Sequence, residues 1–320
     1  GELVTGKAAA RFQPSREVTI RAAASTGFRA PGLAQSHFSK VVTNVIGGVF
    51  EEVGIFPVGD RPAQVLGAKA LDEETAVNLS AGIAFTPVEN LTLTVDYFHI
   101  KIEDRILLGA TFDDAATQAI FADSGITGVT GVQYSTNGLD TRTQGADITA
   151  SLRVPVGPAG TLDLAAALNY TKNEITRVDP LPQVLQAYGS TEPGIIDSVT
   201  WIAIEDERPE RRATLTAQYS TGRFRLLLRG SNFGRFSSAQ PGFCDQCRER
   251  YGAKTLYDAE VGYRVGQVNA SLGIRNLFDT FPDQPKDDFN NNFGTFPWAA
   301  ASPFGYNGRY VYARVEMRLQ

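Results

Sequence analysis

Several features are scarce in this chain of 320 residues, and each scarcity excludes a class of protein. No stretch approaches the roughly 18 consecutive apolar residues that a membrane-spanning helix requires. Closed barrels are the only other structures that satisfy every backbone polar group inside hydrocarbon, so passage through a bilayer would have to use strands. The net charge is −5, and lysine and arginine do not cluster. This charge pattern argues against nucleic acid as a partner.

Catalytic and metal-binding patterns are also sparse. The only histidines are His37, in an expected loop, and His99, on an expected strand, whereas a nucleophilic triad needs a histidine held beside its nucleophile. No glycine-rich phosphate loop follows a strand and opens a helix. A calcium ion bound by Asp283, Asp287 and Asp288 is a weak alternative. We therefore expect a protein that is not an enzyme and that holds no cofactor and no metal.

The chain has only two cysteines, Cys244 and Cys247, in a CxxC arrangement between two expected strands. A zinc site would need two further ligands, and a thioredoxin-like redox pair would need a βαβ context that is absent. We predict a local disulfide that closes the tip of an extracellular loop. Such a bond implies an oxidising compartment.

The dominant pattern is an alternation of apolar and polar residues with a period of two. Successive side chains of a strand point to opposite faces, so each such segment has one apolar and one polar face. In residues 146–154 every even position is apolar, whereas Asp147 and Arg153 lie on odd positions. Strands in soluble sheets usually run about five or six residues, and these segments are longer. The pattern favours a sheet with hydrocarbon on one side and water on the other.

The alternation predicts eleven strands, the first of them partial, near residues 5–13, 17–25, 75–86, 91–103, 142–154, 161–175, 211–220, 223–233, 254–265, 267–277 and 309–319. Short turns rich in proline, glycine or asparagine alternate with long loops at 26–74, 104–141, 176–210, 234–253 and 278–308. This layout is typical of an outer-membrane barrel with short periplasmic turns and long extracellular loops. Bacterial single-chain barrels have an even number of strands, so eleven do not close. We expect the C-terminal part of a larger barrel.

Aromatic residues indicate where a membrane boundary would lie, because amphipathic rings suit the interface. The tyrosines placed toward strand ends beside long loops are Tyr97, Tyr170, Tyr219, Tyr257, Tyr310 and Tyr312. Cross-strand aromatic packing is the alternative. One strand changes phase after Tyr97, where Phe98, Ile100 and Ile102 make the opposite face apolar. Either a bulge intervenes there or the strand rises above the membrane.

One face of the expected sheet carries so many charges that a dry core would be costly, and a wet lumen or a polar plug fits better. The residues expected to face a lumen or a plug are Arg223, Arg225, Arg229, Asp258 and Glu260. The three arginines form one asymmetric patch that would suit acidic plug residues or an anionic solute. Cross-strand pairing without a ligand role is the alternative.

The long loops supply the candidates for substrate contact, since a rigid barrel would hold them. The loop aromatics that could stack on a sugar, a siderophore or a corrin are Phe38, Trp201, Phe289, Phe293, Phe296 and Trp298. Packing of one loop on another is the alternative for each of them. Residues 113–122 predict a short helix with an aspartate cap inside a loop.

Five segments, taken in order, carry a resemblance to a known family. They are the GFRAP sequence at 27–31, the long hairpin at 74–105, TRTQG at 141–145, NLFD at 276–279 and the opening Gly308-Arg309-Tyr310 of the last strand. Their order and spacing resemble the C-terminal half of the barrel of a TonB-dependent outer-membrane receptor. The chain departs from the common pattern at residues 317–320, which lack a terminal aromatic residue.

The resemblance implies an all-β, antiparallel transmembrane barrel of about 22 strands, closed by an N-terminal plug, in the outer membrane of a Gram-negative bacterium. Residues 1–320 would form part of that barrel domain, without the plug and the TonB box. The implied function is import of a scarce nutrient, of the siderophore, cobalamin or oligosaccharide class, with energy supplied by TonB. The implied partners are outer-membrane lipid, the plug, TonB and the nutrient. A passive porin-like channel and a surface structural or adhesive β protein are the alternatives.

Overall fold

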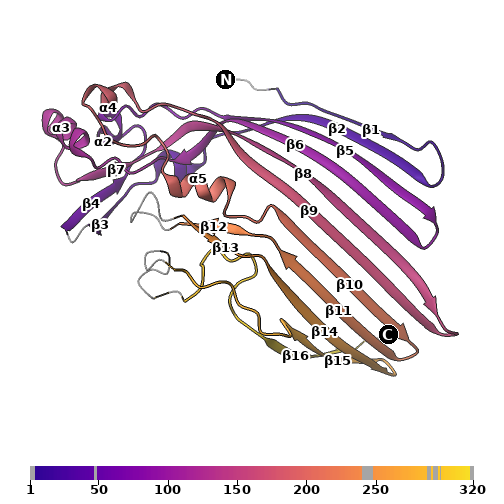
Figure 1. Cartoon of the computed structure of the whole chain (residues 1–320). Helices are drawn as coiled ribbons and strands as arrows, with labels where there is room; N and C mark the ends of the chain where they lie inside the picture. Colours follow the sequence, from indigo (N-terminus) through magenta and orange to yellow (C-terminus); the bar gives the residue numbers. More distant parts are fainter. Residues whose placement is uncertain are drawn as a thin grey trace.

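The computed structural model describes residues 4–46, 49–239, 248–286, 290, 295 and 297–317. Eleven of the described strands form one antiparallel sheet in which neighbours follow each other along the chain, and β1 and β16 are its two edges (Figure 1). The strands are β1 (Lys7–Phe12), β2 (Val18–Arg29), β5 (Glu74–Val88), β6 (Leu91–Leu108), β8 (Ser135–Val156), β9 (Gly160–Val178), β10 (Arg211–Thr221), β11 (Phe224–Phe233), β14 (Lys254–Val265), β15 (Val268–Arg275) and β16 (Tyr310–Met317). Each corresponds to one predicted strand, so the alternation located all eleven.

Tight turns join the strands at one end of the sheet. Gly157, Gly222 and Gly266 occupy three of these turns with positive φ angles of 66°, 54° and 58°. Glycine adopts this conformation without the steric cost that a Cβ would bring. The short connections are therefore encoded locally.

The phase change within β6 comes from the length of the strand. The ladders of β6 with β5 and with β8 run without a break from Thr94 to Ile102, so no bulge separates Tyr97 from Phe98. β6 continues to Leu108, and its partner β8 begins at Ser135. The bulge alternative is therefore wrong at this position, and the strand continues well beyond the level of Tyr97.

The registers separate the two faces of the sheet. One row across five neighbouring strands contains Ile20, Ile83, Val95, Ile148 and Leu168, and we call the face it marks the apolar face. The adjacent row contains Arg21, Gly82, Asp96, Asp147, Asn169 and Arg212, and it marks the polar face. Residues directly opposite in antiparallel strands share a face, so the alternation extends across the whole sheet.

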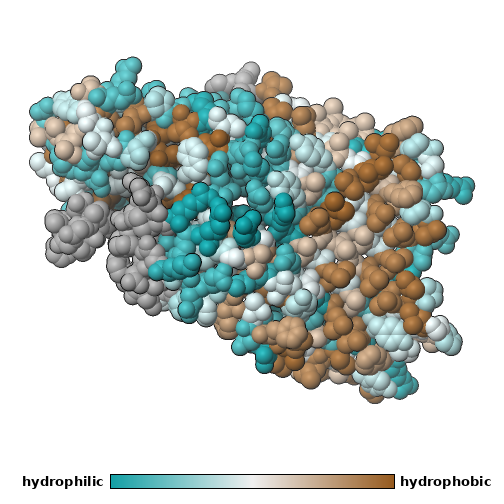
Figure 2. Space-filling view, in the orientation of Figure 1, coloured by the Kyte–Doolittle hydropathy of each residue, from teal (hydrophilic) through white to brown (hydrophobic). Residues whose placement is uncertain are grey.

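A boundary crosses the apolar face at Tyr97 and Tyr170, which lie in one row. Two rows farther toward the long loops, the same face carries the charged residues Lys101, Arg142 and Glu174. From this boundary toward the short turns, residues 146–154 of β8 present only apolar side chains on the apolar face. That length matches the roughly 9–11 residues a strand needs to span a bilayer. Figure 2 shows hydrophobic residues gathered toward the short-turn end of the molecule.

Four of the six tyrosines do not lie in the boundary row. Tyr257 is on the apolar face, but it shares a row with Gly230, Leu215 and Ala166, nearer the short turns than Tyr170. Tyr310 and Tyr312 pair with Arg275 and Gly273 on the polar face, so they do not lie on the apolar face. Tyr219 lies on the apolar face, but beside the Gly222 turn at the short-turn end. Proximity to a loop is a poor guide here, because the face of a residue is set by its parity along the strand.

The buried hydrophobic core lies in the long loops, because the sheet alone leaves both faces open. The loop elements are α1 (Leu33–His37), β3 (Lys40–Ile46), β4 (Val49–Ile55), α2 (Arg61–Val65), α3 (Ala115–Ser124), β7 (Gly131–Gln133), α4 (Gln183–Ala187), α5 (Ser198–Glu205), β12 (Phe236–Ser238) and β13 (Glu249–Tyr251). The main cluster, which we call the loop cap, contains Ala63, Leu66, Phe112, Ile120, Phe121, Val132, Tyr134, Leu139, Leu185, Ile195 and Ile196. Thus three long loops pack together. None of the described helices is long and apolar enough to cross a membrane.

The predicted loop helix at 113–122 is α3, shifted by two residues. Asp114 is its N-cap, as an aspartate cap was predicted, and its carboxylate accepts a hydrogen bond of 2.9 Å from the Thr117 amide. The other carboxylate oxygen accepts hydrogen bonds from Ser190 Oγ and the Thr191 amide at 2.7 and 2.8 Å. Asp114 therefore ties two loops of the loop cap together.

The Asp114 contacts predict acid sensitivity of the loop cap. Burial alone raises the pKa of Asp114, but its hydrogen bonds outweigh burial and lower the pKa below the ordinary value. A lowered folded-state pKa contributes stability above the unfolded value of about 4, and this contribution is lost as the pH falls through the folded pKa. We expect protease cleavage within residues 109–134 and 179–197 to accelerate below pH ~4 in the wild type. In Asp114→Ala, cleavage at pH 7 should already be faster, and an unchanged rate would contradict this role.

Candidate functional site

The polar face of the C-terminal strands is the candidate site, because its charges are unbalanced. Over β10 to β16 this face carries six arginines and three carboxylates, at Arg212, Arg225, Arg229, Arg264, Arg275, Arg314, Asp258, Glu260 and Glu316. The excess of cations contrasts with the net charge of −5 of the whole chain. We call this surface, together with Arg223 in the turn that precedes β11, the basic wall.

Glu260 is the central carboxylate of the basic wall and is 8% exposed. Arg225 Nη2 donates to Glu260 Oε1, and Tyr312 Oη donates to Glu260 Oε2, both at 2.6 Å. Gly273 lies between Glu260 and Tyr312 in the same row. The missing side chain at Gly273 leaves the space through which the Tyr312 ring reaches across β15. The structure thus brings the predicted residues Arg225 and Glu260 together as an internal ion pair.

The other members of the predicted patch have different surroundings. Arg229 lies directly opposite Asp258, yet its Nε donates to Thr216 Oγ1 at 3.3 Å. Asp258 instead accepts a hydrogen bond of 2.9 Å from the Asn276 amide. Arg223 is exposed and follows the Gly222 turn. Neither Arg223 nor Arg229 has an ion pair among the described residues, so both guanidinium groups remain accessible to a solute.

On the N-terminal strands, by contrast, several charges of the polar face are paired internally, although Lys7 and Arg11 on β1 have no ion pair among the described residues. Arg21 Nε donates to Asp96 Oδ1 at 2.7 Å, although β5 lies between their strands. A Cβ built on the intervening Gly82 would lie 1.9 Å from Asp96 Oδ1, so this glycine is what permits the contact. Arg153 and Asp163 pair directly at 2.6 Å. A glycine on the polar side of the alternation is the sequence signal that could have predicted such a crossing.

The loop aromatics are not gathered into one described site. Phe38 is 49% exposed beside α1, and the indole of Trp201 on α5 donates to Glu205 at 2.8 Å. Trp298 stacks on Phe281 with ring centroids 4.9 Å apart, and this contact joins two parts of the same long loop, not one loop to another. Phe289, Phe293 and Phe296 lie outside the described residues, as do the predicted disulfide partners Cys244 and Cys247. Those predictions therefore remain predictions.

The described residues contain no group of three or more metal-ligating side chains arranged around a common centre. Of the carboxylates in the calcium alternative, Asp283 accepts a hydrogen bond of 2.7 Å from the Gly252 amide and pairs with Lys254. The Lys254 ammonium and the Gly252 amide lower the pKa of Asp283 below its ordinary range. Asp287 and Asp288 lie outside the described residues.

Comparison with known proteins decides the family. A family profile described as "TonB dependent receptor-like, beta-barrel" matches residues 1–277, which is most of the chain. The chain belongs to this family. It forms part of a TonB-dependent receptor barrel, in agreement with the resemblance found in the sequence. A sequence search of curated proteins found no match.

Solved structures share the fold of this receptor barrel at low identity. The ferric enterobactin receptor PfeA of Pseudomonas aeruginosa, in complex with enterobactin, has 14% identity and a TM-score of 0.63 over 97% of this chain and 40% of its own. The siderophore receptor PirA of Acinetobacter baumannii has 15% identity and a TM-score of 0.57 over 97% and 40%. A copper transporter, OprC, has 16% identity and a TM-score of 0.59 over 98% and 39%. This chain therefore spans about two fifths of the length of each.

Proposed function

We propose that this chain is the C-terminal part of the barrel wall of an outer-membrane active transporter that imports a scarce nutrient. The observation that carries the proposal is the division of the sheet, which has an apolar face of membrane-spanning height backed by a charged face. An apolar belt on a tilted antiparallel sheet suits lipid, and a charged face suits a water-filled lumen or a polar plug. The parent protein would add an N-terminal plug and a TonB-contacting segment, and its reaction would be translocation without covalent chemistry.

The basic wall narrows the proposed nutrient to an anionic one. Arg223 and Arg229 offer guanidinium groups that no described carboxylate neutralises. Charge-assisted hydrogen bonds from arginine to carboxylate or phosphate are about twice as strong as neutral ones. Relatives in the family include receptors named for siderophores. Among the siderophore, cobalamin and oligosaccharide classes, we favour a siderophore chelate that carries negative charge.

Uptake by the full-length receptor in cells tests the role of the basic wall. We expect Arg223→Gln together with Arg229→Gln to lower the uptake rate of the anionic nutrient about tenfold, because each lost charge-assisted hydrogen bond is worth ~1.5–3 kcal/mol before screening. Arg16→Gln with Lys69→Gln is a control with the same charge change at exposed positions outside the basic wall. Equal uptake by the wild type and the basic-wall variant, with plug retention unchanged, would reject this role.

The same assay separates active transport from a passive channel. We expect uptake by the wild-type receptor to stop when TonB is deleted, because a plugged barrel opens only when energy is supplied. A porin-like channel would continue to pass the nutrient without TonB. Recovery of the protein without detergent would instead support the surface structural or adhesive alternative.

A further inference from the structure

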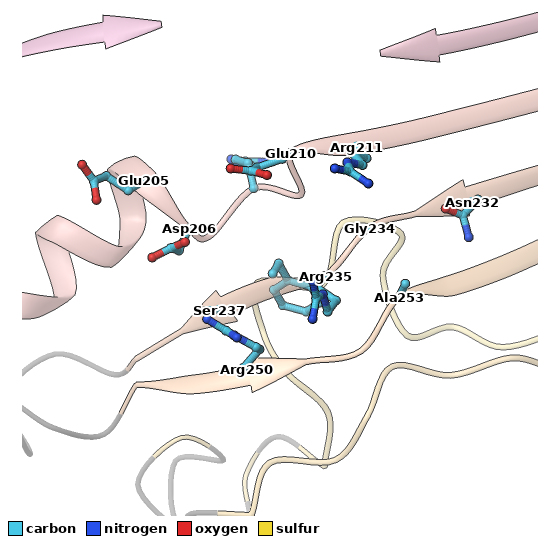
Figure 3. Close-up of a pocket in the computed structure, with 12 residues that line it drawn as sticks. Glu205, Asp206, Glu210, Arg211, Asn232, Gly234, Arg235, Ser237, Arg250 and Ala253 are labelled. Atoms are coloured by element: carbon cyan, nitrogen blue, oxygen red, sulfur yellow. The ribbon is translucent and has the colours of Figure 1, made fainter. Parts of the chain in front are cut away.

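A polar cleft of about 520 Å³ opens at the level where the apolar face ends. Arg211, at the start of β10, lies directly opposite Tyr170 in the boundary row, and its guanidinium lies 5.9 Å from the centroid of the Tyr170 ring. Arg208, Arg235 and Arg250 line the same cleft, and Figure 3 shows that Arg211, Arg235 and Arg250 come from three separate segments around it. The cleft therefore places four arginines where lipid headgroups meet the barrel.

A second hollow of about 460 Å³ adjoins the cleft on the membrane side. Its floor is made of small residues on the apolar face, including Ala166, Ala213 and Gly230, and Leu168, Leu215 and Tyr257 also line it. Asn232 lines both the cleft and this trough, so the two are neighbours on the same surface. An apolar trough on a lipid-facing surface has the shape and the chemistry to hold an acyl chain.

The charges of the cleft favour an anion. None of its four arginines has an ion pair among the described residues. Its carboxylates at Glu205 and Asp206 are engaged elsewhere: Glu205 Oε1 accepts from the Ile175 amide at 2.7 Å, and Asp206 pairs with Arg248. Glu210 is exposed beside Arg211, so the cleft retains an excess of positive charge. Arginine forks match the geometry of phosphate oxygens better than lysine does.

We propose that this site binds a phosphate-bearing lipid of the outer leaflet, with one acyl chain in the trough and its phosphate among Arg211, Arg235 and Arg250. The proposal rests on the proposed function only for the location of the barrel in the outer membrane. It requires neither transport nor a plug. The bound lipid would fix the height of the barrel in the bilayer. It would also hold together the ends of α5, β10, β11 and β13 that surround the cleft.

The test measures lipid binding to the purified full-length receptor in detergent by native mass spectrometry. The probes are bis-phosphorylated lipid A, the same lipid after removal of both phosphates, and inorganic phosphate. One variant combines Arg211→Gln, Arg235→Gln and Arg250→Gln, and a second, Ala213→Leu, fills the trough. A control combines Arg16→Gln, Lys69→Gln and Arg309→Gln, which removes the same charge from exposed positions elsewhere. Heat-modifiable migration on gels verifies that each variant is a folded barrel.

We expect the wild type and the control to bind the phosphorylated lipid at least tenfold more tightly than the dephosphorylated one. The triple arginine variant should lose that preference, and Ala213→Leu should weaken binding of both lipids. Equal binding by the wild type and the triple variant, or equal binding of the two lipids by the wild type, would overturn the proposal. Displacement of the lipid by millimolar inorganic phosphate would also overturn it, because the site would then recognise the free ion. Uptake is not part of the readout, so failure here is distinct from failure of the transport function.

Discussion

Replacing Leu164 with arginine is expected to lower the free energy of unfolding in a lipid bilayer by about 2–4 kcal/mol, the cost of a cation near the midplane of an outer-membrane barrel. Leu164 lies on the apolar face of β9, directly opposite Leu152 and Ala217. It is two residues from Ala166, the middle of the five apolar-face positions from 162 to 170. Denaturant unfolding of the full-length receptor in vesicles, followed by loss of heat-modifiable migration, measures the change.

The neighbouring residue supplies a matched control. Ala165 lies opposite Ser151 and Thr216 on the polar face, where a wet lumen or a polar plug would solvate an added charge. We expect Ala165→Arg to change stability by less than about 1 kcal/mol, in line with the small effect of exposed charges. The comparison isolates the effect of the sheet face on stability, because the two substitutions share a strand, a depth and an added charge. Similar losses for both variants would show that the two faces have been assigned wrongly.

Most of the barrel wall could be predicted from the sequence because the wall follows a simple physical rule. A strand between hydrocarbon and water must alternate, and this local pattern located every one of the eleven sheet strands. Parity along the strands also predicted that Arg225 and Glu260 share one face, as they do. The same rule places Tyr312 on the polar face, since it shares parity with Arg314. The prediction of an interfacial Tyr312 was wrong because nearness to a loop gives the height of a residue on its strand but not its face.

The loops could not be predicted in this way because their contacts are not local. β4 pairs in parallel with β7, so Val53 lies opposite Gly131, and no periodic pattern links the two segments. The loop cap joins Leu66, Phe112 and Leu185 from three different loops, and their burial depends on how those loops fold together. The extension of β8 back to Ser135 was likewise missed, because its first residues pair with β6 above the boundary, where strict alternation is no longer required.

Adding a side chain at Gly273 is expected to lower the free energy of unfolding nearly as much as placing a charge on the apolar face. A Cβ at this position would lie 2.3 Å from Cζ and 2.5 Å from Oη of Tyr312, so Gly273→Ala must expel the ring. Expulsion removes the hydrogen bond from Tyr312 to Glu260, whose side chain is 9% exposed. A buried acceptor left unsatisfied costs ~1–3 kcal/mol. We therefore expect a loss of stability in that range, measured by denaturant unfolding of the folded receptor.

Two comparisons attribute the cost to the Tyr312 crossing. Gly27→Ala is the control, because no heavy atom lies within 4 Å of a Cβ placed there. That variant should be neutral or more stable by up to ~1 kcal/mol through the lower entropy of its unfolded chain. In a Tyr312→Ala background the ring is absent, so Gly273→Ala should lose most of its cost. If Gly273→Ala lowers the stability equally in that background, the glycine is needed for the backbone conformation at position 273. The contact that Tyr312 makes across β15 would then contribute little to the stability of the basic wall.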